Sequence, residues 1–197
     1  MNALLLAKAE TAAETVAEAV AGPVSEAEAR LRALVGRHFD VTFRLLRRLG
    51  VPASDLDDAM QEVIWVLSRK LDQVEPDRER AFMLSTAYRV ASTLRRTLRR
   101  RREDPESLVS SSGAESDPEA LLERRRARAL LDRLLDQLPL EQRSVFVLFE
   151  LERFTMVEIA ETLGLRPGTV ASRLRRARRA FAASVEELER KLDGGRR

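Results

Sequence analysis

The chain has 197 residues and carries 35 Lys and Arg against 32 Asp and Glu, so its formal net charge is only +3 although 34% of its residues are charged. It contains no cysteine, and His38 is its one histidine. Disulfides and cysteine–histidine zinc sites are therefore excluded, and a serine–histidine–aspartate site would depend on His38 as its base. We expect no metal and no cofactor.

The N-terminal residues 1–24 are rich in alanine and are separated from the rest by Gly22-Pro23. They lack the positive start and long apolar run of a signal peptide. No segment of the sequence approaches the roughly 20 apolar residues that span a bilayer. We expect a loosely attached extension on a cytoplasmic protein that does not insert into membranes.

Residues 25–102 are predicted to form a first helical domain. Ser25, followed by Glu28, is a capping box that begins its first helix, and Gly50 ends that helix shortly before Pro52. The residues between them that recur at three- and four-residue steps, the period of an amphipathic helix, are Leu31, Leu34, Val35, His38, Phe39, Thr42, Leu45, Leu46 and Leu49.

Two further helices are predicted in this domain. Ser54 or Asp55 can cap the second helix. Its apolar side is predicted to comprise Leu56, Ala59, Met60, Val63, Ile64, Trp65, Val66 and Leu67. Pro76 breaks the chain, and a third helix over about residues 78–102 begins with apolar residues and ends in arginine.

Residues 103–119 are polar, contain Pro, Ser and Gly, and show no periodicity, which is typical of a flexible linker between domains. The alternative, one compact domain with a long structureless loop, would be unusual. Residues 120–192 then predict four helices. The first ends before Pro139, and the others cover residues 141–151, 156–163 and 168–192. A short tail follows at 193–197. The expected fold class is all-α, with two small helical domains.

The stretch from Met156 to Ala177, MVEIAETLGLRPGTVASRLRRA, has the pattern of a helix-turn-helix. Ala160 is small enough for two helices to approach closely, and Gly164 occupies the turn, where a positive φ is expected. The apolar contacts between the two helices are assigned to Ile159, Leu163, Leu165, Val170 and Leu174. In DNA-binding proteins the second helix of this motif enters the major groove.

The second helix of the motif carries only positive charge. No acid occurs between Thr162 and Val185, whereas a solvated helix usually mixes signs, so a polyanion is the expected partner. The candidate DNA contacts are Arg166, Thr169, Ser172, Arg173 and Arg176, with Arg178 and Arg179 assigned to phosphates. The alternative is a helical hairpin with a basic solvated face.

The second predicted helix begins with an acidic cluster. Asp55, Asp57, Asp58 and Glu62 occur with no basic residue between Leu49 and Ser68. Acids in a first helical turn favour the helix dipole, which is one interpretation. The other is a basic partner, because Asp58 and Glu62 lie four residues apart, where like charges repel.

The third predicted helix ends in arginines and carries aromatic residues. Aromatic rings that stack on bases beside arginines that hold the backbone suit single-stranded or melting DNA. The alternatives are core packing for Phe82 and Tyr88 and a basic tail without a ligand. The candidate residues are Tyr88, Arg89, Arg95, Arg96 and Arg99.

Together these blocks resemble the extracytoplasmic-function (ECF, group 4) sigma factors of bacterial RNA polymerase. Residues 54–68, SDLDDAMQEVIWVLS, look like the helix of that family that binds core polymerase. Residues 82–102 look like the helix that melts and reads the −10 element. Residues 138–181, with LP..QR and the EIAETLG…GTVASRLRRAR run, look like region 4 and are the most specific part of the resemblance.

The resemblance implies partners and roles. Asp58, Gln61 and Glu62 would meet the β′ clamp helices of core RNA polymerase, and an apolar surface at residues 145–151 would meet the β flap. The helix after Gly164 would read the −35 element of promoter DNA. Tyr88 and Arg89 depart from the Ala-Arg-Asn run that the family often has at this place. Many members are held inactive by an anti-sigma factor, but no feature of these residues identifies one.

Two other functions compete with this interpretation. A helix-turn-helix regulator could bind duplex DNA without polymerase, but it would need no acidic helix paired with an arginine-rich melting helix. A nucleic-acid enzyme should show clustered carboxylates for a metal, or a P-loop. The carboxylates from Asp55 to Glu62 lie on one helix with no partner set elsewhere. We therefore expect a protein that is not an enzyme.

Overall fold

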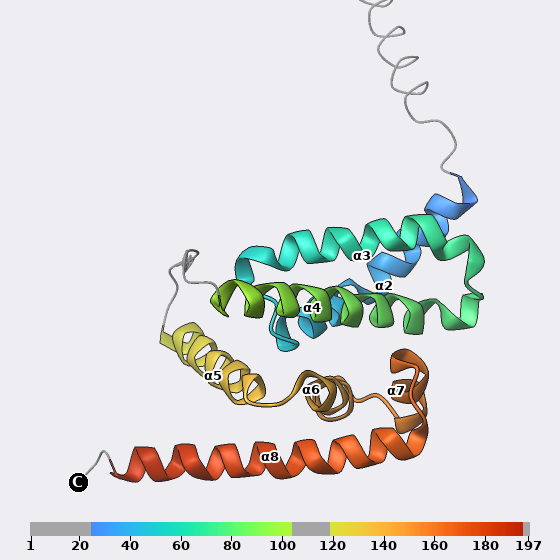
Figure 1. The fold of residues 1–197 in the computed structure, drawn as a ribbon. Coiled ribbons are helices and arrows are strands. Elements are labelled where there is room, and N and C mark those ends of the chain that lie inside the picture. Colours follow the sequence, from blue (N-terminus) through green and yellow to red (C-terminus); the bar gives the residue numbers. More distant parts are fainter. Residues whose placement is uncertain (1–24, 104–118, 195–197) are drawn as a thin grey trace, which may run out of the picture.

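The computed structural model describes residues 25–103 and 119–194, and these residues contain helices and no strand. The predicted all-α class is confirmed. The N-terminal extension, nearly all of the predicted linker and the last three residues lie outside the described residues. Figure 1 shows the helices, which are α2 (Glu26–Arg48), α3 (Leu56–Lys70), α4 (Glu79–Glu103), α5 (Glu119–Asp136), α6 (Leu140–Phe146), α7 (Met156–Leu163) and α8 (Pro167–Gly194).

Helices α2, α3 and α4 pack against one another and form the first half of the molecule. The predicted cap of α2 is confirmed, because the hydroxyl of Ser25 accepts a hydrogen bond from the backbone N–H of Glu28 at 3.2 Å. Gly50 follows α2 with φ of 90°, a conformation that only glycine adopts without strain. Asp55, one of the two predicted residues, occupies the N-cap position of α3, but its side chain makes no capping hydrogen bond to the helix backbone. The Ser54 hydroxyl instead donates to the Asp55 carboxylate at 2.7 Å.

The second half is built from α5 to α8. The predicted single helix over residues 141–151 divides into α6 and a π-helical segment, Val147–Leu151. Helix α7 begins with a capping box that was not predicted from the sequence. The Thr155 hydroxyl accepts from the Glu158 N–H at 3.3 Å, and the Glu158 carboxylate accepts from the Thr155 N–H at 2.8 Å.

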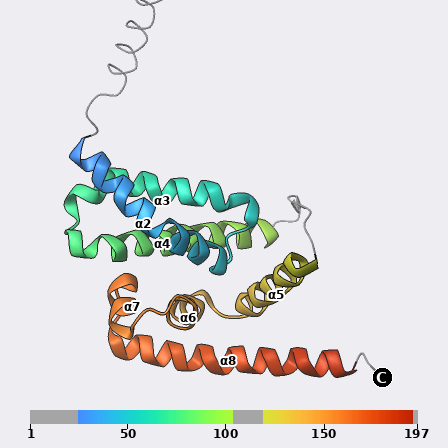
Figure 2. The same cartoon turned by 180° about the vertical axis from the view of Figure 1, so that it is seen from behind.

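The two halves pack on each other as layers. In Figures 1 and 2 helices α6 and α7 lie between α4 and α8, and α4 contacts α7 directly. One cluster of buried apolar side chains runs through both halves and includes Leu49 and Val51 from the first and Leu135 and Leu138 from the second. Burial of apolar surface therefore joins the halves, in addition to polar contacts.

Buried charged groups cross the boundary between the halves. Glu152 has a side chain only 3% exposed, and it accepts hydrogen bonds from Arg44 Nε at 3.2 Å, from Arg44 Nη2 at 2.8 Å and from Arg48 Nη1. Arg143, whose side chain is fully buried, donates to the backbone carbonyl of Arg48 and to the carboxylate of Asp136. Buried charges are stable only when they are paired and hydrogen-bonded, so this geometry ties α2 to α6 and to the π-helical segment.

A second set of contacts joins α4 to the second half. Arg80 Nη1 lies 3.1 Å from Glu158 Oε1, and its guanidinium is 4.1 Å from the centre of the Phe154 ring. Arg95 Nη1 donates to the carbonyl of Leu49 at 2.8 Å and lies 3.8 Å from Asp136. Both arginines thus lie at the boundary between the halves. Arg80 contacts residues of the second half, and Arg95 binds acceptors on both sides.

The turn after α7 generates the first prediction. Gly164 has φ of 64°, and a Cβ built there meets no atom within 4 Å, so Gly164→Ala introduces backbone strain alone. We expect it to lower the free energy of unfolding by about 1 kcal/mol. Gly36 lies inside α2 with equally open space, so Gly36→Ala should raise the same quantity by about 0.5–1 kcal/mol. Urea unfolding measures the free energy of unfolding of both variants. The same change in both would contradict the left-handed turn assigned to Gly164.

The buried carboxylate between the halves generates the second prediction. Glu152→Gln leaves Arg48 without its carboxylate partner in a site of low exposure, and we expect a loss of about 2–4 kcal/mol in the free energy of unfolding. The matched control is Glu187→Gln, which breaks the exposed pair with Lys191 on α8 and should leave stability unchanged. Equal unfolding midpoints for wild type and Glu152→Gln would refute a stabilising role for this contact.

Candidate nucleic-acid interface

The turn between α7 and α8 places a second helix across the first. After Gly164 the Leu165 N–H bonds to the carbonyl of Ala160 at 2.8 Å, which closes the end of α7. Helix α8 begins at Pro167, one residue earlier than predicted, and a proline fits a first helical position because no partner is needed for its nitrogen. The predicted contacts between the helices are confirmed for Ile159, Val170 and Leu174, which are buried, while Leu163 and Leu165 are half-buried.

Most of the predicted DNA-contacting residues lie in the early part of α8, and Arg166 directly precedes this helix. The Ser172 hydroxyl donates to the carbonyl of Thr169 at 3.0 Å, and Arg176 Nε donates to the carbonyl of Ser172 at 3.3 Å. Thr169, Ser172 and Arg173 are half-buried, whereas Arg166 and Arg176 are exposed. This part of α8 is thus a helix face of hydroxyls and guanidinium groups, which can both donate to phosphates and base edges.

The later arginines of α8 differ from one another. Arg178 lies 2.6 Å from a carboxylate oxygen of Glu150, and its guanidinium is 5.2 Å from the centre of the Phe149 ring. Arg179 is exposed, and among the described residues neither it nor Arg173 takes part in an ion pair. The pairing of Arg178 was not predicted from the sequence, because Glu150 is far from it along the chain.

The candidate residues on α4 point in different directions. Arg89 and Arg96 are exposed, and Arg89 Nη2 lies 3.3 Å from the Ser85 hydroxyl. Tyr88 is half-buried and packs against the core cluster. Arg95 reaches inward to the carbonyl of Leu49, so in this arrangement it is engaged by the protein. The side chain of Arg99 lies outside the described part of the chain.

Helix α3 shows an acidic exposed face. Asp58, Gln61 and Glu62 are all exposed, and within residues 25–103 and 119–194 neither Asp58 nor Glu62 takes part in an ion pair. The residues of α3 that face the core are Leu56, Ala59, Met60, Val63 and Leu67. The carboxylates are thus exposed to solvent on one side of α3, while the opposite side of the helix packs against the core.

The prediction that Trp65 lies on the apolar side of α3 is wrong. Its side chain is 53% exposed, and the guanidinium of Arg69 lies 4.9 Å from the centre of its ring. Trp65 follows Glu62 by three residues and Asp58 by seven, which places it on the acidic face. The continuous apolar run from Val63 to Leu67 obscured this helical period.

The apolar segment assigned to the β flap is mostly inside the protein. Val145, Val147 and Leu148 are fully buried and Phe146 is 7% exposed, so an exposed apolar surface at this place is not formed by them. Phe149 and Leu151 are half-buried and form the accessible remainder. The sequence shows a continuous run of apolar residues, which does not reveal how many of them are exposed. In the structure this segment is covered on several sides by α8 and by the first half.

Two titratable groups flank the contact between α4 and α7. The pKa of Glu158 is lowered, first by the hydrogen bond from the Thr155 backbone N–H, then by the Thr155 hydroxyl, and further by Arg80. The pKa of His38 is lowered by burial and by the nearby charges of Arg80 and Arg37. At neutral pH the carboxylate is therefore charged and the imidazole is neutral, which suits a structural contact.

Metal binding and membrane insertion each require a characteristic grouping of residues. In the two described ranges, 25–103 and 119–194, no group of three or more histidines, aspartates or glutamates is arranged to hold a metal ion. No helix in that part of the chain combines the length and the apolar composition needed to cross a bilayer.

Comparisons with known proteins agree with this geometry. Residues 128–181 match the family model described as Sigma-70, region 4, and they include α6, α7 and the turn into α8. The ECF RNA polymerase sigma factor SigL of Mycobacterium tuberculosis is 30% identical over 178 residues, which cover 86% of this chain and 96% of that protein. The ECF sigma-E factor of Escherichia coli is 30% identical over 154 residues, 72% of this chain and 79% of that protein.

Another relative is longer. SigE of Mycolicibacterium smegmatis is 31% identical over 151 residues, which cover 74% of this chain but only 57% of that protein. Among solved structures, CnrH in complex with the cytosolic domain of CnrY matches with a TM-score of 0.62 and 25% identity, over 80% of this chain and 88% of that one. RpoE of Bartonella quintana, in complex with the anti-sigma factor NepR, has a TM-score of 0.60 at 18% identity, over 79% and 96% of the two chains, and shows the fold alone.

The identity to SigL and sigma-E extends over most of this chain, so it is not confined to either half. The region 4 match covers the part of the chain where the exposed arginines of α8 lie. The chain belongs to the ECF family of RNA polymerase sigma factors.

Proposed function

We propose that the exposed face of α3 binds core RNA polymerase through Asp58, Gln61 and Glu62, and that α8 reads the −35 element of the promoter. The observation that carries this is the division of charge. Carboxylates with no ion-pair partner among the described residues occupy α3, and arginines without such a partner occupy α8 in the same chain. Opposite surfaces of this kind suit a basic polymerase helix and a nucleic acid.

Helix α4 is proposed to contact the −10 element. Arg89 and Arg96 are exposed there and can hold a phosphate backbone, while Tyr88, which is half-buried, precedes Arg89 on the same helix. Arg95 and Arg99 complete the set assigned from the sequence. For Arg95 to reach DNA, its bond to the carbonyl of Leu49 must first be released.

The packing of the two halves against each other, called the closed packing below, limits how far apart α4 and α8 can contact DNA. The −35 and −10 elements are separated by about 25 base pairs, or roughly 85 Å of straight duplex at about 3.4 Å per base pair. Helices α4 and α7, at 1.5 Å per residue, are roughly 38 Å and 12 Å long, and Arg80 joins them to each other through Glu158. We therefore propose that the halves separate when the protein occupies a promoter.

An anti-sigma factor is a further proposed partner. The two solved structures named above are both complexes, one with the cytosolic domain of CnrY and one with the anti-sigma factor NepR. A partner that favours the closed packing would hold α4 and α8 too close together for a promoter. This supports an inhibitory partner without identifying it.

The alternative function is a helix-turn-helix regulator that binds duplex DNA without polymerase. Such a protein gains nothing from an exposed acidic helix that also carries Trp65. The two functions make different demands on α3 and the same demands on α8, so variants of α3 separate them.

Charge reversal on α3 tests the polymerase contact. The double variant Asp58→Lys with Glu62→Lys should weaken binding to core polymerase by about tenfold or more, because it places like charges against a basic partner. The matched control is Glu186→Lys with Glu189→Lys, which reverses two charges on α8. Affinity for core polymerase, measured by surface plasmon resonance, should fall only in the first variant; unchanged binding there would favour the regulator.

Truncation of arginines on α8 tests promoter recognition. Arg173→Ala or Arg176→Ala should each cost about 1–3 kcal/mol at the cognate −35 sequence if the side chain contacts bases. Arg190→Ala, further along the same helix and exposed, is the matched control. Fluorescence anisotropy on cognate and scrambled duplexes decides the role, since equal weakening on both would reassign the residue to phosphate contact.

A further inference from the structure

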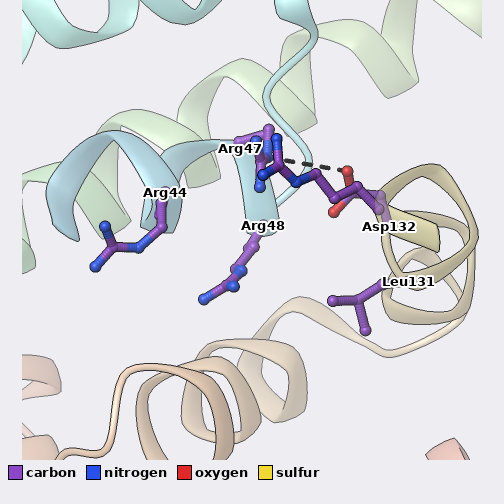
Figure 3. A pocket seen from close by; sticks show the side chains of 6 residues that line it. Arg44, Arg47, Arg48, Leu131 and Asp132 are labelled. Carbon is purple, nitrogen blue, oxygen red and sulfur yellow. Dashed lines mark ion pairs between the residues drawn. The ribbon is translucent and has the colours of Figure 1, made fainter. Parts of the chain in front are cut away.

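A pocket lined mainly by arginines lies between the two halves of the protein. It encloses about 300 Å³, and its walls come from the last turns of α2 and from α5 (Figure 3). The lining residues are Arg44, Arg47, Arg48, Arg128, Leu131 and Asp132. In Figure 3 the guanidinium of Arg47 faces Asp132 across the gap between α2 and α5.

The positive charge of this pocket is only partly neutralised. Arg44 and Arg48 share one carboxylate, that of Glu152. Arg47 Nε lies 4.0 Å from Asp132, too far for a hydrogen bond, and among the described residues Arg128 takes part in no ion pair. Four guanidinium groups therefore face two carboxylates.

Buried hydrogen-bond donors also remain without partners here. The Nε atoms of Arg47 and Arg48 are buried and have no acceptor among the described residues. Buried donors are nearly always satisfied in folded proteins, so these two Nε atoms remain available to an acceptor that enters the pocket. The negative end of the α2 dipole favours cations at its last turn, but it does not reach Arg128 on α5.

We infer that this pocket binds a small anion that carries phosphate groups. Guanidinium groups present planar pairs of donors that match phosphate oxygens, and a site with several of them is selective for such anions. The volume is at the lower end of the range for small-ligand sites. The pocket lies between two helices and is small, so it fits a free small molecule better than a DNA duplex. The proposed contacts to the duplex lie on α4 and α8.

An occupied pocket should favour the closed packing of the halves. Arg44, Arg47 and Arg48 repel one another; the pKa of Arg48 is lowered by burial and also by its two arginine neighbours. An anion between α2 and α5 relieves this repulsion only while the two halves are together, so it binds the closed form more tightly. The effect on promoter binding rests on the proposed function, whereas binding of the anion does not.

Calorimetric titration of the full chain with inorganic pyrophosphate, at constant ionic strength, tests the site. Arg47→Gln and Arg128→Gln should each weaken binding by about tenfold. Asp132→Asn removes the carboxylate that competes with the anion and should tighten binding several-fold. Arg32→Gln is the matched control, because it removes an exposed arginine from the same helix outside the pocket and should leave the affinity unchanged.

The outcomes are distinguishable. Absence of saturable binding, or an equal loss in Arg32→Gln, overturns the site. If Arg47→Gln weakens binding of non-specific duplex DNA and leaves pyrophosphate affinity unchanged, the pocket holds the DNA backbone and the inference is also overturned. Asp132→Asn gains affinity only in a folded protein, so this result does not depend on the stability of the arginine variants.

The link to the closed form has its own measurement. Because the chain has no cysteine, Asp72→Cys and Ala183→Cys allow a dye pair to be attached at exposed positions in the two halves. Pyrophosphate should raise energy transfer between the dyes in this protein and leave it unchanged after Arg47→Gln. Binding without any rise in transfer would overturn the link. Both readouts are made without polymerase or promoter, so their failure would not be confused with failure of the proposed function.

Discussion

Pairing of buried charges between the halves is the constraint on which the rest of the structure depends. The side chain of Arg143 is fully buried and positively charged. It donates hydrogen bonds to the backbone carbonyl of Arg48 and to the carboxylate of Asp136. Glu152 is nearly buried and is stabilised by arginines of α2. Because an unpaired charge in such a place is costly, these contacts keep the two halves in one register. A purely apolar interface would allow many more relative positions.

The same charges would lower the cost of the separation proposed above. Each of them can be solvated again if the halves separate, whereas the apolar side chains that the two halves share would lose their contacts. The small net charge of the chain conceals separate groups of charge. Acids lie on the exposed face of α3, arginines lie on α8, and charges of both signs are paired at the boundary between the halves.

Local features could be predicted from the sequence, and features set by distant residues could not. The cap at Ser25, the positive φ of Gly164 and the buried contacts of Ile159 and Val170 depend on residues close in the chain. The arginines of α8 and the exposed acids of α3 depend only on helical spacing, so their placement on these helices could be predicted as well, and their roles in binding stay predictions. By contrast, the pairing of Arg178 with Glu150 and the inward direction of Arg95 depend on how helices pack. Trp65 was misplaced because a continuous apolar run hides which side of a helix is exposed, and burial of residues 145–148 follows from packing that no local pattern records.

Run-off transcription with core RNA polymerase over a genomic DNA library tests sigma activity most directly. We expect a discrete set of start sites that share upstream sequences near −35 and −10 and that are absent with core polymerase alone. Specific binding of the chain to DNA without any new start sites would contradict this expectation and establish a regulator that acts without sigma activity.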